Sequence, residues 1–275
     1  MQILGLDFFD GDVTQAVDRA LERRGLIVAP SGTCFRRLQR DKIYRDAMLK
    51  ADLILPDSGF MVLLWRLLRG KSVTRISGLA YLNNLLGRAE FRDDRSVLWV
   101  LPNESAKDKT LAWVQTHGFP TTNGDCYVAP IYSCSGGLRP SSSYEVTDPA
   151  LLDRMQSRQP SHVIIALSGG VQEKLGFYVR ENGFPPSASG PNSPFPISHS
   201  ESPRPPAIHC IGAALGFVTG YQVAIPPWAD RLYLGWFIRL LANPRRFFPR
   251  AMSALALPGL IVKYGEELPP PAASR

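Results

Sequence analysis

The chain of 275 residues lacks the cysteine and histidine patterns that bind metal ions. Its four cysteines form no CxxC pair and no Cys/His zinc spacing, and its four histidines stand singly, without an HExxH or HxH pattern. This excludes the common zinc sites, and we expect no metal site. We interpret the cysteines as free thiols in a reducing compartment, with disulfides as the alternative. The cysteines are Cys34, Cys126, Cys134 and Cys210.

Long apolar runs are also missing. Crossing a bilayer takes roughly 18 to 20 apolar residues, whereas the richest stretch, residues 232–244, is interrupted by Arg239. The first residues, MQILGLDFFDGD, have neither the basic start nor the long apolar centre of a signal peptide. We therefore expect a cytoplasmic protein that lies on a membrane surface if it meets a membrane at all.

Three common catalytic motifs are absent as well. There is no GKS/T phosphate loop, no GxGxxG and no GxSxG, which argues against a P-loop NTPase, a standard dinucleotide enzyme and an acyl hydrolase. No DxD pair follows a strand-like segment, since Asp93 and Asp94 stand in a charged, loop-like setting. A transfer reaction without metal or cofactor is the simplest prediction.

What is present is a large apolar content and an excess of positive charge. The chain is 45% hydrophobic and 10% aromatic, enough to bury a substantial core. Its formal net charge of +7 and isoelectric point near 9.4 indicate an anionic partner. A nucleotide, a nucleic acid and a membrane surface all remain open on charge alone.

Short apolar segments alternate with amphipathic ones along the chain. Apolar strand-like segments are expected at residues 25–30, 51–56, 96–101, 162–167 and 208–214. Helices are expected at residues 13–24, 34–49, 59–68 and 105–117 and from residue 171 onward. Ser105 is a candidate N-cap of the fourth of these helices. Strands that are apolar at every position are typical of a parallel sheet covered by helices on both faces. The sequence therefore predicts a Rossmann-like α/β fold.

Polar and glycine residues follow several of these strands. Ligands of such sheets collect at the carboxyl ends of the strands, and helix N-termini there favour anions such as a diphosphate. Any one glycine-rich turn is ordinary structure, but the coincidence of several favours a binding site. The residues concerned are Ser31, Gly32 and Thr33 after the first strand, Asp57 after the second, Gly169, Gly170, Gln172 and Glu173 after the fourth, and Gly212 and Gly216 in and after the fifth.

The order of these motifs resembles the WecG/TagA/CpsF glycosyltransferase family over roughly residues 1 to 250. The most specific blocks are ADLILPDSG, VQEK and GWFIRLLANPRR. The resemblance implies an inverting, metal-independent hexosyltransferase on the inner face of the cytoplasmic membrane. It would move an N-acetylmannosamine-type sugar from a UDP donor to a polyprenyl-diphosphate-linked acceptor in cell-surface polysaccharide synthesis.

The resemblance also assigns roles to residues. Asp57 matches the family's catalytic base, and Arg75 matches the arginine that neutralises the leaving diphosphate. Gln172 and Glu173 match a pair of residues near the donor, in which Glu173 would accept hydrogen bonds from the ribose hydroxyls. The residues alone also allow simpler roles. Asp57 could be only the N-cap of the helix at residues 59–68, or an N-cap as well as the base. Arg75 could be a solvated arginine, and Glu173 an ordinary first-turn acid. The further predicted substrate contacts are Ser31, Thr33, Gly59, Gly169, Gly212, Arg239 and Arg245.

Several positions depart from the family pattern. Ala29-Pro30-Ser31 stands where the family has Thr-Pro-Asn, so a short hydroxyl replaces an amide near the sugar. Pro102-Asn103 replaces a glycine pair, Ala80 and Gly216 each replace an acid, and residues 224–226 read Ala-Ile-Pro in place of Arg-Ala-Pro. These changes predict a divergent member with a different sugar or with reduced activity.

Composition divides the chain into a core and an appendage. We predict an α/β core at residues 1–222 with an inserted Pro/Ser-rich loop at residues 184–206, which is a disordered spacer or a lid over the donor. Residues 223–275 mix aromatic and arginine side chains, a composition suited to a membrane interface. The resemblance implies that they form a helical membrane-docking appendage, whose Arg239 and Arg245 meet the donor or lipid diphosphate. The alternative is a helical pair packed on the core with solvated arginines.

Two other functions stay open at this point. The family departures would suit a nucleotide-sugar-binding protein that has lost catalysis, and the basic aromatic tail would suit a nucleic-acid-binding protein. We predict a UDP-sugar, a lipid-linked acceptor and a membrane surface as partners, and no nucleic acid. Homo-oligomer formation, the sugar and the acceptor are left open by the sequence.

Overall fold

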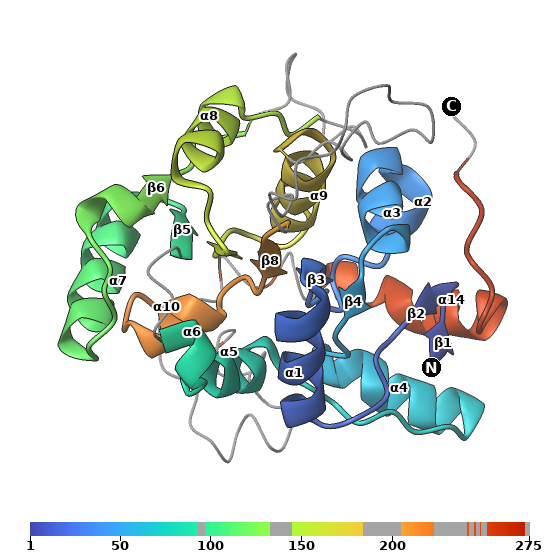
Figure 1. The fold of residues 1–275 in the computed structure, drawn as a ribbon. Helices are drawn as coiled ribbons and strands as arrows, with labels where there is room; N and C mark the ends of the chain where they lie inside the picture. The colour runs from blue at the N-terminus through green and yellow to red at the C-terminus, as the bar shows by residue number, and fades with distance from the viewer. Residues whose placement is uncertain are drawn as a thin grey trace, which may run out of the picture.

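The fold is built on a six-stranded parallel sheet covered by helices (Figure 1). The computed structural model describes residues 1–92, 97–132, 145–183, 205–222 and 252–272, together with Leu241, Arg245 and Phe248. The strand order is β4-β3-β8-β7-β5-β6. This confirms the predicted α/β class. The strands are β3 (Gly25–Val28), β4 (Leu53–Ile54), β5 (Val97–Leu101), β6 (Cys126–Val128), β7 (His162–Ile165) and β8 (Ala207–Cys210).

Each central strand sends alternate side chains into two separate cores. In β3, Leu26 and Val28 belong to one buried cluster and Ile27 to the other. In β5, Leu98 and Trp99 divide in the same way. Because successive side chains of a strand point to opposite faces, a sheet with a core on each face needs apolar residues at every strand position. This is the physical reason for the continuous apolar runs in the sequence.

The helices divide between the two faces accordingly. One core contains side chains of α1 (Val13–Arg23), α5 (Gly78–Leu86), α6 (Ala89–Arg92), α7 (Glu104–Thr116) and α10 (Ala214–Val218). The other contains side chains of α2 (Arg37–Arg40), α3 (Lys42–Leu49), α8 (Pro149–Arg158) and α9 (Gln172–Gly183). Beyond β4, α4 (Gly59–Arg69) packs against α14 (Ala256–Tyr264), near the small hairpin of β1 (Gln2–Ile3) and β2 (Leu6–Asp7) (Figure 1).

Three predicted element boundaries were wrong. The single helix expected at residues 34–49 is two helices, because Asp41 adopts an extended backbone and accepts the Tyr44 N–H at 3.1 Å as the N-cap of α3. The helix α7 is capped by Asn103 rather than Ser105. The strand expected at residues 208–214 ends at Cys210, and the chain then turns into α10.

A buried ion pair ties α9 to the start of α3. The Nζ of Lys174 lies 3.0 Å from Oδ2 of Asp41, with side-chain exposures of 0% and 3%. Arg37 lies 3.8 Å from the same carboxylate oxygen. Water cannot solvate Lys174 and Asp41, so each of these two charges depends on the other to offset the cost of burial.

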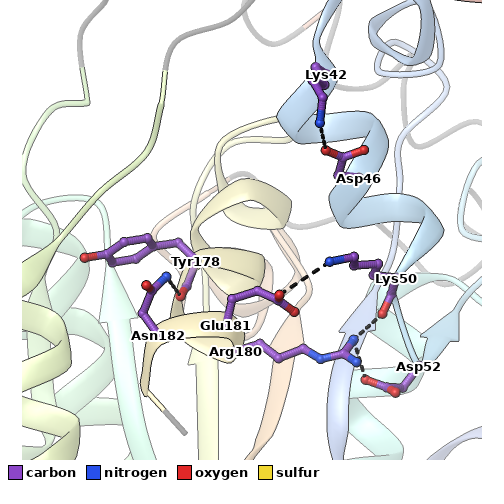
Figure 2. Close-up of polar contacts among 8 residues, drawn as sticks. All are labelled: Lys42, Asp46, Lys50, Asp52, Tyr178, Arg180, Glu181 and Asn182. Atoms are coloured by element: carbon purple, nitrogen blue, oxygen red, sulfur yellow. Dashed lines mark hydrogen bonds and ion pairs between the residues drawn. The ribbon is translucent and has the colours of Figure 1, made fainter. Parts of the chain in front are cut away.

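The other end of α9 is fastened by exposed contacts instead (Figure 2). Arg180 lies 3.0 Å from Asp52, and Glu181 lies 3.4 Å from Lys50. The Arg180 guanidinium also donates to the backbone oxygen of Lys50. Exposed pairs of this kind contribute little to stability, typically about 0 to 1 kcal/mol, so Glu181 is a suitable control position for changes made deeper in α9.

Two buried histidines, His162 of β7 and His209 of β8, lie side by side on the face of the sheet that α5 covers. The Nδ1 of His209 is 2.9 Å from the Tyr81 hydroxyl, and its Nε2 is 3.2 Å from Nδ1 of His162. Burial, and then the neighbouring His162, hold the pKa of His209 well below its usual range. The folded protein therefore keeps His209 neutral.

This predicts acid sensitivity with a definite sign. A depressed pKa contributes stability above the unfolded-state value near 6.5, and that contribution is lost as the pH falls below it, by up to about 1.4 kcal/mol per pH unit. We expect urea unfolding between pH 7.5 and 5 to show this loss. His209→Gln should flatten the profile. Burial raises the pKa of Glu173, which acts in the opposite direction, so the comparison of this variant with the wild type isolates His209. An equal profile in His209→Gln would contradict this account.

Part of the predicted architecture lies outside the described residues. Of the predicted insertion, only residues 205–206 are described, and of the predicted appendage only residues 252–272, which include α14, and three single residues. In the described part of the chain, no helix is long and apolar enough to cross a membrane. The division at residue 222 stays a prediction.

Candidate functional site

A cavity of about 450 Å³ lies at the carboxyl ends of the strands. Residues that follow each of the six strands contribute to its wall. This volume falls within the range of small-molecule sites, roughly 300 to 1,000 Å³. Six of the predicted site residues line it: Ser31, Asp57, Arg75, Gly169, Gln172 and Gly212.

Asp57 lies between β4 and α4 but does not cap α4. Ser58 is the N-cap, its Oγ accepting the Met61 N–H at 3.2 Å. Asp57 instead uses Oδ1 to accept the N–H of Gly78 at 2.8 Å, in the first turn of α5. The capping alternative for Asp57 is therefore wrong. A helix N-terminus stabilises a carboxylate, so α5 holds Asp57 at the cavity wall.

Arg75 reaches the same wall from the segment that precedes α5. Its Nε donates to the backbone oxygen of Asp57 at 2.9 Å, across 18 residues of sequence. The N–H of Ile76 donates to the oxygen of Pro56 at 3.3 Å. These contacts align the two segments and bring a guanidinium and a carboxylate to one cavity. A guanidinium there is suited to binding phosphate oxygens.

Another part of the wall is formed by the turn between β7 and α9. Gly170 has a φ of +88°, which a residue with a side chain rarely adopts. Gln172 follows the turn and is only 2% exposed. Its Nε2 donates to the backbone oxygen of Cys210 at 3.2 Å and lies 3.3 Å from Oε1 of Glu173. Its Oε1 is buried and has no hydrogen-bond partner among the described residues.

Glu173 does not line the cavity, although it follows Gln172 directly. It is fully buried beneath the turn, and its Oε2 accepts the N–H of Gly170 at 2.6 Å. Burial raises the pKa of this carboxyl, while the hydrogen bonds from Gly170 and Gln172 and the nearby Arg37 act against that rise. A ligand in the cavity therefore does not reach the Glu173 carboxyl, and the predicted contact between Glu173 and ribose hydroxyls does not fit this arrangement.

The remaining predicted contacts are spread more widely. Ser31 lines the cavity, with its Oγ 2.9 Å from Oγ1 of Thr33, but Thr33 and Gly59 are not among the residues of the wall. Arg245 is exposed and is not part of the wall either. Arg239 lies outside the described residues.

The structure adds wall residues that sequence reasoning did not assign to the site. Asn103 follows β5 and donates from Nδ2 to the Tyr221 hydroxyl at 2.7 Å, joining two parts of the wall. Tyr132 follows β6 and donates to Asp148 at 2.7 Å. The signal for β6 was weak, because that strand is only three residues long. Further wall residues are Leu79, Pro102, Ile131, Phe217 and Gln222.

Within residues 1–92, 97–132, 145–183, 205–222 and 252–272, no three histidine, cysteine, aspartate or glutamate side chains gather as a metal site. The polar side chains of the cavity wall include a carboxylate, a guanidinium, amides and hydroxyls, among them those of Asp57, Arg75, Asn103, Gln172, Gln222 and Ser31.

A parallel α/β sheet with such a cavity at its carboxyl edge defines a class, the α/β proteins whose ligands bind at the strand ends. Within that class, the chain belongs to the WecG/TagA/CpsF glycosyl transferase family, whose model matches residues 1–268. It is therefore a glycosyltransferase of cell-surface polysaccharide synthesis, and the family suggests a sugar-nucleotide donor and a lipid-linked acceptor. Among curated proteins, none matches the chain significantly.

Proposed function

We propose that the protein transfers a hexose of the N-acetylmannosamine type from a UDP-sugar to a polyprenyl-diphosphate-linked acceptor, with inversion and without a metal ion. One observation carries the proposal. Asp57 and Arg75, far apart in sequence, contact each other and line the same cavity as Gln172. A base and a cation for a diphosphate are the two groups that such a transfer needs.

The chemistry follows from these two groups. The acceptor hydroxyl oxygen attacks the anomeric carbon from the face opposite the UDP, and the Asp57 carboxylate takes the hydroxyl proton. The bond between the anomeric carbon and the diphosphate oxygen breaks, so negative charge grows on the departing UDP. The Arg75 guanidinium offsets that charge with paired hydrogen bonds. The Gly78 N–H holds one oxygen of Asp57 in place during the step.

A membrane surface as the partner is supported by the outward side of α4. Leu63 and Leu67 are 47% and 79% exposed, and Arg66 and Arg69 are exposed on the same helix. An apolar stripe flanked by basic residues is suited to the interface of an anionic membrane. We propose that the protein binds the inner face of the cytoplasmic membrane, where a lipid-linked acceptor would lie, and that residues 223–275 contribute to this binding.

The proposal is tested by transfer on liposomes that carry a polyprenyl-diphosphate-linked amino sugar. UDP-N-acetylmannosamine, UDP-N-acetylglucosamine and UDP-glucose are offered in competition, and UDP release and the mass of the lipid product are measured with and without EDTA. We expect the lipid to gain the mass of one sugar residue, with UDP release that depends on the acceptor and survives EDTA.

Other results of this transfer assay, or of binding assays with UDP-sugars and RNA, would overturn parts of the proposal in distinct ways. UDP-sugar binding without acceptor-dependent UDP release would indicate a binding protein that lacks catalysis. Salt-sensitive RNA binding without UDP affinity would indicate a nucleic-acid-binding protein. Loss of transfer in EDTA, restored by a divalent cation, would contradict the metal-independent mechanism alone.

A further inference from the structure

The amide of Gln172 has only one orientation that suits its surroundings. Its Nε2 faces two acceptors, the Cys210 backbone oxygen and Oε1 of Glu173. An amide turned over would put oxygen against oxygen at both contacts. The orientation present leaves Oε1 as a buried acceptor without a partner in the described part of the chain, on a side chain that lines the cavity. A buried acceptor without a partner is costly, so such a group calls for an explanation.

The Glu173 carboxylate is held so that both of its oxygens accept. Oε2 takes the N–H of Gly170 and Oε1 takes the amide hydrogen of Gln172. Gly170 belongs to the turn that carries Gly169 at the cavity wall. The carboxylate therefore connects the turn to the one side chain of α9 that lines the cavity.

The charges below the turn keep this carboxylate in place. Arg37 lies against Gly170 and opposes the rise in the Glu173 pKa, and Lys174 pairs with Asp41 in the same region. Burial raises the Glu173 pKa, and Arg37 together with the hydrogen bonds from Gly170 and Gln172 favours the carboxylate form against that effect. The buried Lys174–Asp41 pair holds its two members in defined positions, because each depends on the other.

We propose that Glu173 is a positioning residue that fixes the polarity of the Gln172 amide, so that the cavity presents an acceptor to an N–H or O–H group of the sugar-nucleotide donor. This inference rests on the proposed function and deepens it. A UDP-sugar carries such donors on its base, its ribose and its sugar. When bound, one of them would satisfy the Gln172 Oε1, and the acceptor would be preorganised for it.

The test is Glu173→Gln, which keeps the shape of the side chain but replaces one acceptor by a donor. If the new oxygen stays on the Gly170 N–H, the new amide nitrogen faces the Gln172 amide. Either N–H groups then oppose each other, or the Gln172 amide turns over and its oxygen faces the Cys210 backbone oxygen, so both orientations disturb the acceptor that the wild-type protein holds in place. We expect the dissociation constant of UDP-N-acetylglucosamine, used as the probe, and the KM of the transferred donor to rise about 10- to 100-fold. The kcat at saturating donor should change less than about threefold, because the acceptor acts on binding.

A double-mutant cycle separates positioning from a merely structural role. In a Gln172→Met background, Glu173→Gln should change donor affinity less than about twofold, because the amide through which it acts is gone. Glu181→Gln, an equivalent change at the exposed end of α9 (Figure 2), should leave affinity and turnover at the wild-type values.

Two results would overturn the inference. One is a folded Glu173→Gln protein with wild-type donor affinity, and the other is an equal loss with and without the Gln172 amide. Should Glu173→Gln fail to fold, Gln172→Met tests the acceptor directly, and unchanged affinity there would also overturn it. A wild-type protein that binds no UDP-sugar would overturn the proposed function instead, so the two failures are distinguishable.

Discussion

Asp57→Asn is expected to lower kcat by about 10²- to 10⁴-fold, the usual contribution of a general base. An asparagine keeps the oxygen that accepts the Gly78 N–H but is unable to take a proton from the acceptor hydroxyl. Folding and donor affinity should therefore stay near the wild-type values. Measurement of UDP release under saturating donor and acceptor, with donor binding measured separately, checks both parts.

A matched control for this variant is Asp46→Asn. Asp46 lies on α3 and pairs with Lys42 at 2.5 Å on the surface (Figure 2). The same chemical change there should leave turnover unaltered. If Asp57→Asn retained a tenth or more of the wild-type kcat, another group would have to act as the base, and the proposed mechanism would be wrong.

Lys174→Met is expected to lower the free energy of unfolding by about 3 to 5 kcal/mol, because it leaves the Asp41 carboxylate buried without its closest cation. Arg37, at 3.8 Å and 40% exposed, compensates only in part. The loss should appear as a lower urea midpoint with an unchanged slope, since the surface exposed on unfolding stays the same.

The double variant Asp41→Asn with Lys174→Met should recover more than half of that loss. Asparagine is as good an N-cap as aspartate, so the contact with the Tyr44 N–H survives while the unpaired charge is removed. Lys50→Met, which removes the cation of an exposed pair (Figure 2), should cost less than about 1 kcal/mol. A comparably small loss in Lys174→Met would show that the buried pair is not needed for stability.

The strands and most helices could be predicted because their signals are local. The apolar runs at residues 25–30, 51–56 and 162–167 each contain an observed strand, and α4 begins at the predicted residue. The short strand β6 and the break at Asp41 had no comparable signal. A strand of three residues carries too little pattern, and the contact between Asp41 and Lys174 joins residues that are distant in sequence.

The candidate site could be predicted only in part. Asp57 and Gly169 follow apolar strands, so their place at one edge of the sheet follows from the fold class. Arg75 was assigned from the family resemblance, and the cavity brings it beside Asp57. Gln172 and Glu173 were predicted as a pair, yet one lies at the wall and the other beneath it, because neighbouring helical residues point about 100° apart.

By itself the sequence determined the class of fold, the family and the edge of the sheet at which the polar residues gather, since these depend on apolar periodicity and on motifs within short segments. Only the tertiary structure decided that Asp57 meets α5 rather than capping α4, that Glu173 lies below the cavity and that Asn103 closes its wall against Tyr221. These contacts join residues that are far apart in sequence or that differ only in which way they point. These contacts depend on how whole helices and strands pack against one another, so the local sequence pattern does not predict them.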